Sequence, residues 1–261
     1  MDVTEKMKAI QHNTHDEREA IPLAHEAIHE AVVRILAQLP RGIVLDVPAG
    51  EGALAARLLC AGFRVRCCDL YPEIFRLREV EIKRGDLSGA QLPYAEGEFD
   101  YITCIEGLEH IENPQQAIRE FYRLLKPNGH LITSVPNILN IEERIKWLLY
   151  GYTSHFKPLS REHLEDLRRE YGEMEEIALH VNPISYSELR YTLERYGFEI
   201  CQLYRDKPKA QLWAYKPLVW LIRLLARFAS EEKRRARWTN ELHSNEVLLG
   251  GNTLIVHAIR K

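Results

Sequence analysis

The sequence has little of what marks a membrane-spanning, secreted or nucleic-acid-binding protein. None of its apolar runs approaches the roughly 20 residues of a bilayer-spanning helix, and its start, MDVTEK, is polar and charged, unlike a signal peptide. Its five cysteines form no C-x-x-C pair, which favours buried free thiols in a reducing compartment. With 35 basic and 38 acidic residues, the formal net charge is −3, so there is no strong nucleic-acid signal. We therefore expect a globular, cytoplasmic protein.

The stretch from Ile43 to Gly52 is the most informative part of the chain. An apolar strand ends in an acid, a loop with two glycines follows, and a helix is predicted to begin near Ala53. Glycines let backbone amides approach a ligand closely, and a helix start offers unpaired N–H donors. The segment is therefore predicted to bind a nucleotide, through Asp46, Pro48, Ala49, Gly50 and Gly52.

This loop lacks the G-x-G-x-x-G spacing that holds the pyrophosphate of a dinucleotide. Pro48 occupies the first glycine position, and Glu51 places a carboxylate in the positive end of the helix dipole, where pyrophosphate would bind. A ligand with a cationic centre and no phosphate fits better. S-adenosylmethionine, with its sulfonium, free amino group and adenosine, is such a ligand, whereas the cofactor of a dehydrogenase is disfavoured.

Acids also follow the next predicted strands. Asp69 ends the strand over 64–69 and lies 23 residues after Asp46, close to the ~20-residue offset at which an acid meets ribose hydroxyls. After the strand over 80–84, Asp86 is expected to accept from an adenine amino group while Leu87 covers the ring. Glu106 follows the strand over 99–104. In parallel sheets the ligand lies beyond such carboxyl ends, so these acids are expected to surround it.

Further motifs follow in order, and with those above they are Val44–Gly52, Asp69, Asp86-Leu87, Leu92-Pro93, Glu106–His110, Leu125–Gly129 and Ser134–Asn137. The set resembles the class I S-adenosylmethionine-dependent methyltransferases over roughly residues 35 to 200. Two departures are Pro48 and Asn128, each in place of a glycine. The resemblance implies that Leu70 and Ile105 also contact the cofactor.

Predicted strands alternate with predicted helices, which favours a parallel sheet. The resemblance implies an α/β fold: a Rossmann-like, mostly parallel seven-stranded sheet with helices on both faces, a final antiparallel strand, and helical insertions after strands five and six. We expect a single domain over residues 1–261, with later strands over 130–135, 198–204 and 253–259. Its parts are an N-terminal helical cover (1–40), a cofactor-binding core (41–137), a helical lid or acceptor insertion (138–185), a C-terminal core (186–206 and 251–261) and an amphipathic helical insertion (207–250).

Local patterns predict the helices of the cover and of the first insertion. An amphipathic helix is expected over 22–39, with His25 and His29 as exposed residues rather than metal ligands, and with His12 and His15 upstream. In the insertion, an apolar helical face is expected from Ile141, Ile145, Leu148 and Leu149. The mixed charges of 161–176 predict a solvated helix; the alternative is a segment that closes over the acceptor.

The second insertion contains a basic amphipathic segment. Leu218 to Phe228 is apolar and aromatic, and Lys216, Arg223, Arg227 and Arg234 fall near one helical face. Such a helix can lie in a membrane interface, here through residues 215–237 on the inner face of the membrane. The alternative, slightly favoured by the sequence, is a helix packed on the body or on a second subunit in a homodimer.

A cluster suited to chemistry follows the fourth strand. If that stretch is helical, Glu106, Glu109 and His110 share one face and offer oxygen and nitrogen ligands to a divalent ion. The triple resembles the metal site of the ubiquinone-biosynthesis O-methyltransferases and of the terminal-ribose methyltransferases of small RNAs. That resemblance implies His180 as a fourth ligand to Mg²⁺ or another divalent cation. Without a metal, His110 is the preferred general base.

The sequence therefore predicts a methyltransferase that acts on a hydroxyl of a small or a lipid- or saccharide-linked acceptor, by analogy with bacterial relatives linked to cell-surface polysaccharide or lipid synthesis. One alternative is a methyltransferase of small RNA, which the weak basicity disfavours. Another is a non-catalytic cofactor-binding scaffold, which the intact set of Asp46, Gly50, Gly52 and Asp69 disfavours.

Overall fold

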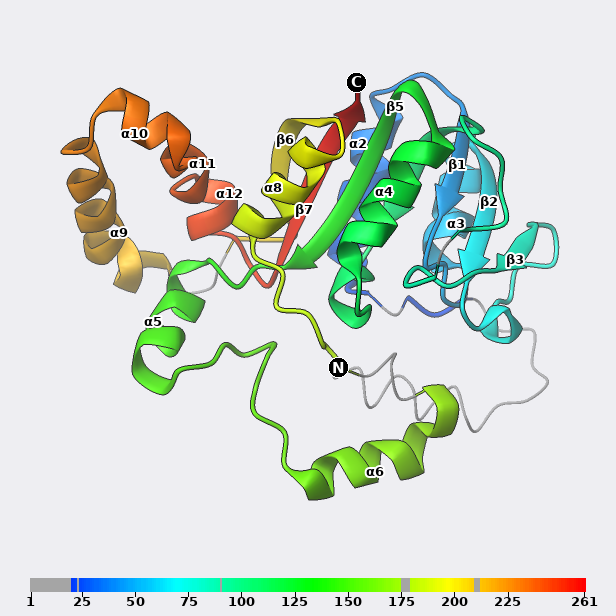
Figure 1. The fold of residues 1–261 in the computed structure, drawn as a ribbon, viewed down its shortest axis with the longest axis horizontal. Helices are drawn as coiled ribbons and strands as arrows, with labels where there is room; N and C mark the ends of the chain where they lie inside the picture. Colours follow the sequence, from blue (N-terminus) through cyan, green and yellow to red (C-terminus); the bar gives the residue numbers. More distant parts are fainter. Residues whose placement is uncertain (1–19, 23, 90, 175–178, 209–211) are drawn as a thin grey trace.

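The computed structural model describes residues 20–22, 24–89, 91–174, 179–208 and 212–261 and shows one seven-stranded sheet (Figure 1). The strand order is β3-β2-β1-β4-β5-β7-β6. Neighbouring strands from β3 to β5 are parallel, and β7 runs antiparallel to both β5 and β6. The predicted fold class is thereby confirmed. The predictions for residues 1–19, including His12 and His15, lie outside the described residues.

The first half of the chain alternates strands with helices. Its elements are α2 (Glu26–Ala37), β1 (Ile43–Asp46), α3 (Ala53–Cys60), β2 (Arg64–Asp69), the 3₁₀ turn η1 (Pro72–Ile74), β3 (Ile82–Arg84), β4 (Phe99–Cys104), the 3₁₀ turn η2 (Leu108–His110) and α4 (Pro114–Leu124). Asn113 caps α4, since its side chain accepts from the Gln116 amide. Parallel strands end at one edge of the sheet, so the acids after β1, β2 and β4 are brought to that edge.

The second half carries the two insertions. Its elements are β5 (Leu125–Pro136), α5 (Ile141–Tyr150), α6 (Arg161–Tyr171), η3 (Gly172–Met174), α8 (Tyr186–Arg195), β6 (Phe198–Arg205), α9 (Leu212–Arg227), α10 (Glu231–Ala236), α11 (Thr239–Leu242), α12 (Asn245–Leu248) and β7 (Thr253–Arg260). Figure 1 shows α5 and α6 beyond the carboxyl ends of the parallel strands, and α9 to α12 to the side of β6 and β7. Across the described ranges, no helix has the length and apolar character needed to cross a bilayer.

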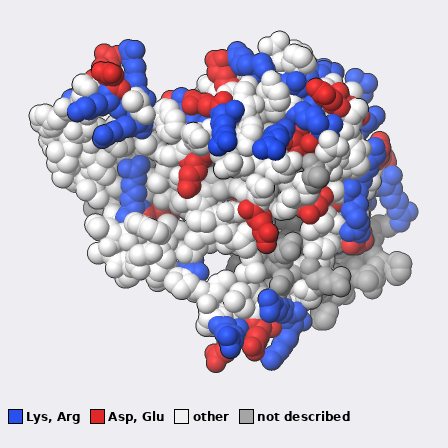
Figure 2. Space-filling model, viewed as in Figure 1, with Lys and Arg blue, Asp and Glu red and all other residues white. Residues whose placement is uncertain are grey.

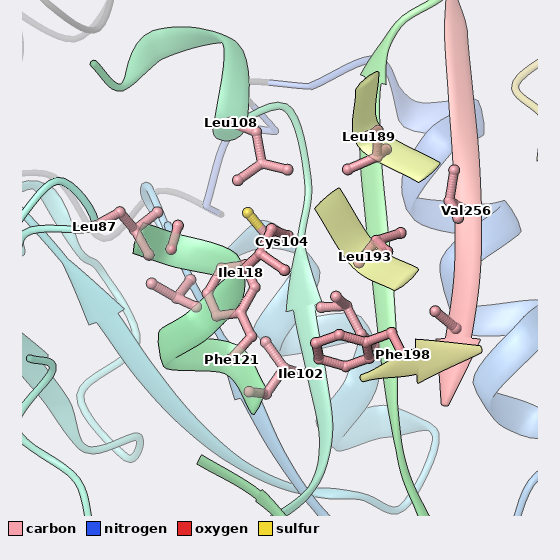
Figure 3. Packing of buried hydrophobic residues seen from close by; sticks show 14 of the residues in the cluster. Leu87, Ile102, Cys104, Leu108, Ile118, Phe121, Leu189, Leu193, Phe198 and Val256 are labelled. Carbon is pink, nitrogen blue, oxygen red and sulfur yellow. The ribbon is translucent and has the colours of Figure 1, made fainter. Parts of the chain in front are cut away.

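Both faces of the sheet are covered, which explains the continuous apolar runs of the strands. Successive residues of β1 point to opposite faces: Leu45 joins the cluster under α4 and α8, and Val44 joins the cluster under α2 and α3. Figure 3 shows the first cluster, with Phe121 and Leu193 packed toward the strands. Burying one such side chain contributes about 1.5–3 kcal/mol, so this core fixes the strand ends that carry the acids.

Several predicted boundaries shift by a few residues. The helix expected over 22–39 spans Glu26–Ala37, and the strand expected over 80–84 spans only Ile82–Arg84. Strand β5 begins at Leu125 rather than His130, because Leu125 already pairs with Phe99 of β4; the register shifts over the residues between Leu125 and His130. Within them, Asn128 adopts the positive φ, 61°, that its replacement of a glycine requires.

The apolar face expected in the first insertion is partly wrong. Ile141 is buried and Ile145 packs beside it, but Leu148 and Leu149 are exposed because no described element covers the last turn of α5. The solvated helix expected next is observed as α6, in which Tyr171 is the one buried residue of the described helix. Residues 175 and 176 of that prediction lie outside the described residues.

Candidate active site

A cavity opens at the carboxyl ends of β1, β2 and β4, where the sequence predicts the cofactor. Most of the predicted contact residues line it: Asp46, Pro48, Ala49, Gly50, Asp69, Leu70, Asp86, Leu87 and Ile105. Glu106, His110 and His180 line it as well. Gly52 does not, because it caps α3 at φ 98° with its Cα facing Phe75 and Leu77 instead. Its role is conformational, since a side chain there would be strained and would strike the Phe75 ring.

Asp69 organises the glycine loop from the neighbouring strand. Its Oδ2 accepts a hydrogen bond from the Gly50 amide at 2.8 Å, and its Oδ1 accepts from the Tyr71 amide at 2.9 Å. A carboxylate has about four acceptor positions, so both oxygens keep capacity for ribose hydroxyls. The sequence predicts only the ligand contact; the structure adds that the same carboxylate holds Gly50, whose φ of 53° few other residues adopt, in place.

Asp46 places an uncompensated carboxyl oxygen in the wall of the cavity. Its Oδ1 accepts from the Thr103 hydroxyl at 2.8 Å, whereas its Oδ2 is buried without a hydrogen-bond partner in the described part of the chain. Burial, with a smaller contribution from the charge of Asp69, raises the pKa of Asp46 to about 7. A buried acceptor of this kind fits a cationic group, and the amino group of S-adenosylmethionine is one.

This carboxyl predicts a pH dependence of cofactor binding. A cation binds the ionised form of Asp46, so affinity for S-adenosylhomocysteine, which keeps the amino group, is expected to fall by up to about tenfold per pH unit below about pH 7. Calorimetric titration across this range, in buffers of different ionisation enthalpy, measures the affinity and the protons released. Asp46→Asn should bind more weakly and lose this pH dependence; an unchanged profile in that variant would refute the assignment.

Glu51 is a buried carboxylate whose charge has partners that the sequence argument did not include. It is 1% exposed, its Oε2 lies 2.7 Å from Nε of Arg76, and the same oxygen accepts from the Ile21 amide at 2.9 Å. Its charge is therefore compensated, and its effect on a diphosphate is smaller than the sequence argument assumed. The stronger evidence is the lining itself, in which the described residues include five acids but no lysine or arginine to hold phosphates.

The sequence argument missed the contribution of the N-terminal cover to this cavity. Ile21, Ala24 and His29 line it, and His29 is buried, 5% exposed, rather than exposed as expected. The sequence position of His29 could have indicated its burial, because His29 directly follows the buried Ile28 and borders the apolar face of α2. His25, in contrast, caps α2 through its Nδ1.

The residues after β4 do not form the α-helix on which the predicted triple depended. Glu106 has a positive φ of 48°, and helical geometry begins only at Leu108, in the 3₁₀ turn η2. The Glu106 Oε1 accepts from the Thr253 hydroxyl at 2.9 Å, and its amide donates to Ser134 Oγ at 2.9 Å. The structure therefore ties Glu106 to β7 and β5 and does not group it with the other three predicted ligands.

Glu109, His110 and His180 do converge. Each offers a ligand atom within 4.8 Å of the others, although His180 is 70 residues further along the chain than His110. Glu109 is 0% exposed, and neither carboxyl oxygen has a hydrogen-bond partner among the residues described. Burial, followed by the nearby charge of Glu106, raises the pKa of Glu109 well above its usual range. An unpartnered buried carboxyl beside two imidazoles fits a bound cation.

The two histidines are held in forms that suit this role. The His110 Nδ1 lies 2.9 Å from the Leu179 carbonyl oxygen, which can only accept, so Nδ1 carries the proton and Nε2 the lone pair. Burial, with a smaller contribution from His155, lowers the pKa of His180 to about 4, which keeps it neutral. Phe156 and His155 pack against the His180 ring, with centroids 5.6 and 6.0 Å away.

Sheet order, a glycine loop between β1 and α3, and acids at the strand ends together define a Rossmann-like protein of the kind that binds S-adenosylmethionine. A family model described as a methyltransferase domain matches residues 21–203. The chain belongs to that family, the class I S-adenosylmethionine-dependent methyltransferases.

Individual relatives agree with this assignment. A ubiquinone biosynthesis O-methyltransferase of Xanthomonas oryzae is 33% identical over 134 residues, which are 47% of this chain and 55% of that protein. The chain thus matches about half the length of the curated relatives. A methyltransferase structure from Archaeoglobus fulgidus covers 89% of this chain and 94% of its own, with a TM-score of 0.54 and 15% identity. The [4+2]-cyclase SpnF has the same TM-score, 0.54, at 17% identity over 99% of this chain and 93% of its own, so structural likeness shows the fold alone.

Proposed function

We propose that the chain transfers the methyl group of S-adenosylmethionine to a hydroxyl of a small or lipid- or saccharide-linked acceptor, with a divalent cation bound next to the cofactor. The observation that carries this proposal is the convergence of Glu109, His110 and His180 beside the cavity, with both oxygens of Glu109 buried and unpartnered. The name of the matched Xanthomonas relative, an O-methyltransferase, supports an oxygen as the methyl acceptor.

The three side chains supply one carboxylate and two neutral imidazoles. This mixed oxygen and nitrogen set suits a divalent ion such as Mg²⁺, Mn²⁺ or Zn²⁺, and the ion would offset the cost of ionising a buried Glu109. When bound, such an ion lowers the pKa of a hydroxyl that coordinates it. An acceptor with adjacent hydroxyl groups would offer two oxygens to an ion held by these residues.

The other residues of the site position the cofactor and remove the proton of the acceptor. Methyl transfer from a sulfonium is an in-line displacement with a good leaving group, so orientation of the two reactants supplies much of the acceleration. Asp46 and Asp69 fix the two ends of the cofactor. In the absence of a cation, the Nε2 lone pair of His110 is the group that takes the acceptor proton. The acid-rich lining disfavours the phosphate backbone of RNA as an acceptor.

Turnover with and without metal tests the proposal. We expect methyl transfer to a soluble catechol to be lost in EDTA and restored by Mg²⁺ or Mn²⁺, because the ion activates the hydroxyl. Binding of Mn²⁺, followed by its electron paramagnetic resonance signal, gives a second measurement that needs no acceptor. Equal turnover in EDTA would remove the metal from the proposal and leave His110 as the base; absence of S-adenosylmethionine binding would remove the proposal itself.

A further inference from the structure

The outer surface of α5 and α9 exposes large apolar side chains that the cofactor cavity does not use. Helix α9 packs on the body through Val219, which forms a small buried cluster with Ile141 of α5 and Leu248 of α12. The sequence-based expectation that the helix packs on the body thus accounts for one face of α9 only. The side chains left exposed are Trp147, Leu148, Leu149 and Tyr150 on α5 and Trp213, Leu218, Trp220, Leu221 and Leu225 on α9, with Phe228 just after it.

The exposure is large and aromatic. Trp220 is 66% exposed and Phe228 81%, and three of the four tryptophans of the chain are exposed on these two helices. Figure 2 shows the surface over α5 and α9 as a largely uncharged area. Many large exposed apolar side chains on two neighbouring helices mark an interaction site.

A basic flank accompanies the apolar face. Helix α9 contains Lys216, Arg223 and Arg227 and no acidic residue. At 100° per residue, these three lie between the buried Val219 and the exposed Trp220, and they line a shallow groove with Trp220. From 213 to 237 the chain has seven basic and two acidic residues, although its overall net charge is −3. The segment that carries the apolar face is therefore positively charged, although the chain as a whole is negatively charged.

We propose that this face of α5 and α9 docks on the surface of an anionic phospholipid bilayer. Tryptophan favours the boundary between headgroups and acyl chains, and basic residues beside it attract anionic lipid. The helix lies on the membrane rather than across it, because no described helix is fit to span one. A second copy of the chain is a poorer occupant, since a two-fold contact on this face would bring the two basic flanks together.

Vesicle flotation tests this proposal with the whole chain. We expect the protein to float with vesicles that contain phosphatidylglycerol, to remain unbound with pure phosphatidylcholine, and to lose binding at high salt. The double variant Trp220→Ser/Phe228→Ser should reduce binding to anionic vesicles about tenfold or more, and Lys216→Gln/Arg227→Gln should reduce both binding and its salt dependence. The matched controls are Tyr191→Ser on α8 and Arg161→Gln on α6, two exposed residues outside this face.

Circular dichroism establishes that each variant is folded. Failure of the parent chain to bind anionic vesicles would overturn the proposal, as would binding that is unaffected by either double variant. Sedimentation velocity tests whether a second copy of the chain occupies this face instead. A dimer that Trp220→Ser/Phe228→Ser dissociates, without any vesicle binding by the parent chain, would assign this face to a second copy instead.

Discussion

Replacing Glu109 with glutamine is expected to lower metal-dependent turnover about 100-fold or more while leaving the metal-free protein as stable as the parent or more stable. The amide keeps the volume of the side chain but cannot supply a charged ligand, and loss even of residues that support metal ligands costs about 10–100-fold. Stability should not suffer, because neither oxygen of Glu109 has a hydrogen-bond partner among the described residues. Turnover with Mg²⁺, together with thermal melting with and without the metal, measures both effects.

The direction in which stability depends on pH distinguishes a role of Glu109 as a metal ligand from a structural role. The pKa of Glu109 is raised in the folded protein, so without metal the folded state binds more protons than the unfolded state. The stability contributed by the protonated carboxyl is present at low pH and is lost as the pH rises through the folded-state pKa. Glu109→Gln should remove this loss and abolish any rise in melting temperature caused by Mn²⁺. If the matched control Glu112→Gln, at a nearby exposed position, has the same effects, the metal assignment fails.

Replacing Asp69 with alanine is expected to weaken cofactor binding about 100-fold, or roughly 2.7 kcal/mol. Two losses combine: the acceptors for the ribose hydroxyls disappear, and the amides of Gly50 and Tyr71 lose the carboxylate that orders the loop. Calorimetric titration with S-adenosylhomocysteine measures the change.

Two variants divide the effect of Asp69. Asp69→Asn keeps one acceptor oxygen and should give an intermediate affinity, whereas Glu79→Ala, an exposed acid on the loop before β3, should bind as the parent does. A dissociation constant for Asp69→Ala equal to that of the parent would show that the cofactor does not use this strand end.

The features that the sequence predicted correctly are those fixed by neighbouring residues. Asp46 and Asp69 stand at the ends of the strands expected before them, and the helix expected after the glycine loop begins at Ala53. The positive φ of Asn128 follows from its replacement of a glycine in a turn. Each depends on interactions within a few residues, which a single sequence records directly.

Features that depend on distant segments were not predicted. Glu106 is held by Thr253, 147 positions away, and its backbone conformation breaks the helical spacing that would have joined it to Glu109. Glu51 meets Arg76 and the Ile21 amide, so its charge is offset by partners that no local pattern reveals. His29 is buried beside the cavity, although the amphipathic pattern of α2 alone does not require it.

The way in which the second insertion is attached has a consequence for how the protein can change. A β-bridge between Pro208 and Gly250 joins the two ends of the second insertion. Its last helices are hydrogen-bonded to the body: the Asn137 side chain donates to the Val247 carbonyl oxygen, and Arg144 donates to the Leu242 carbonyl oxygen. The outer surface of α9 takes no part in these contacts. Substitutions on that outer surface can therefore accumulate without breaking the contacts that hold the insertion to the body of the protein.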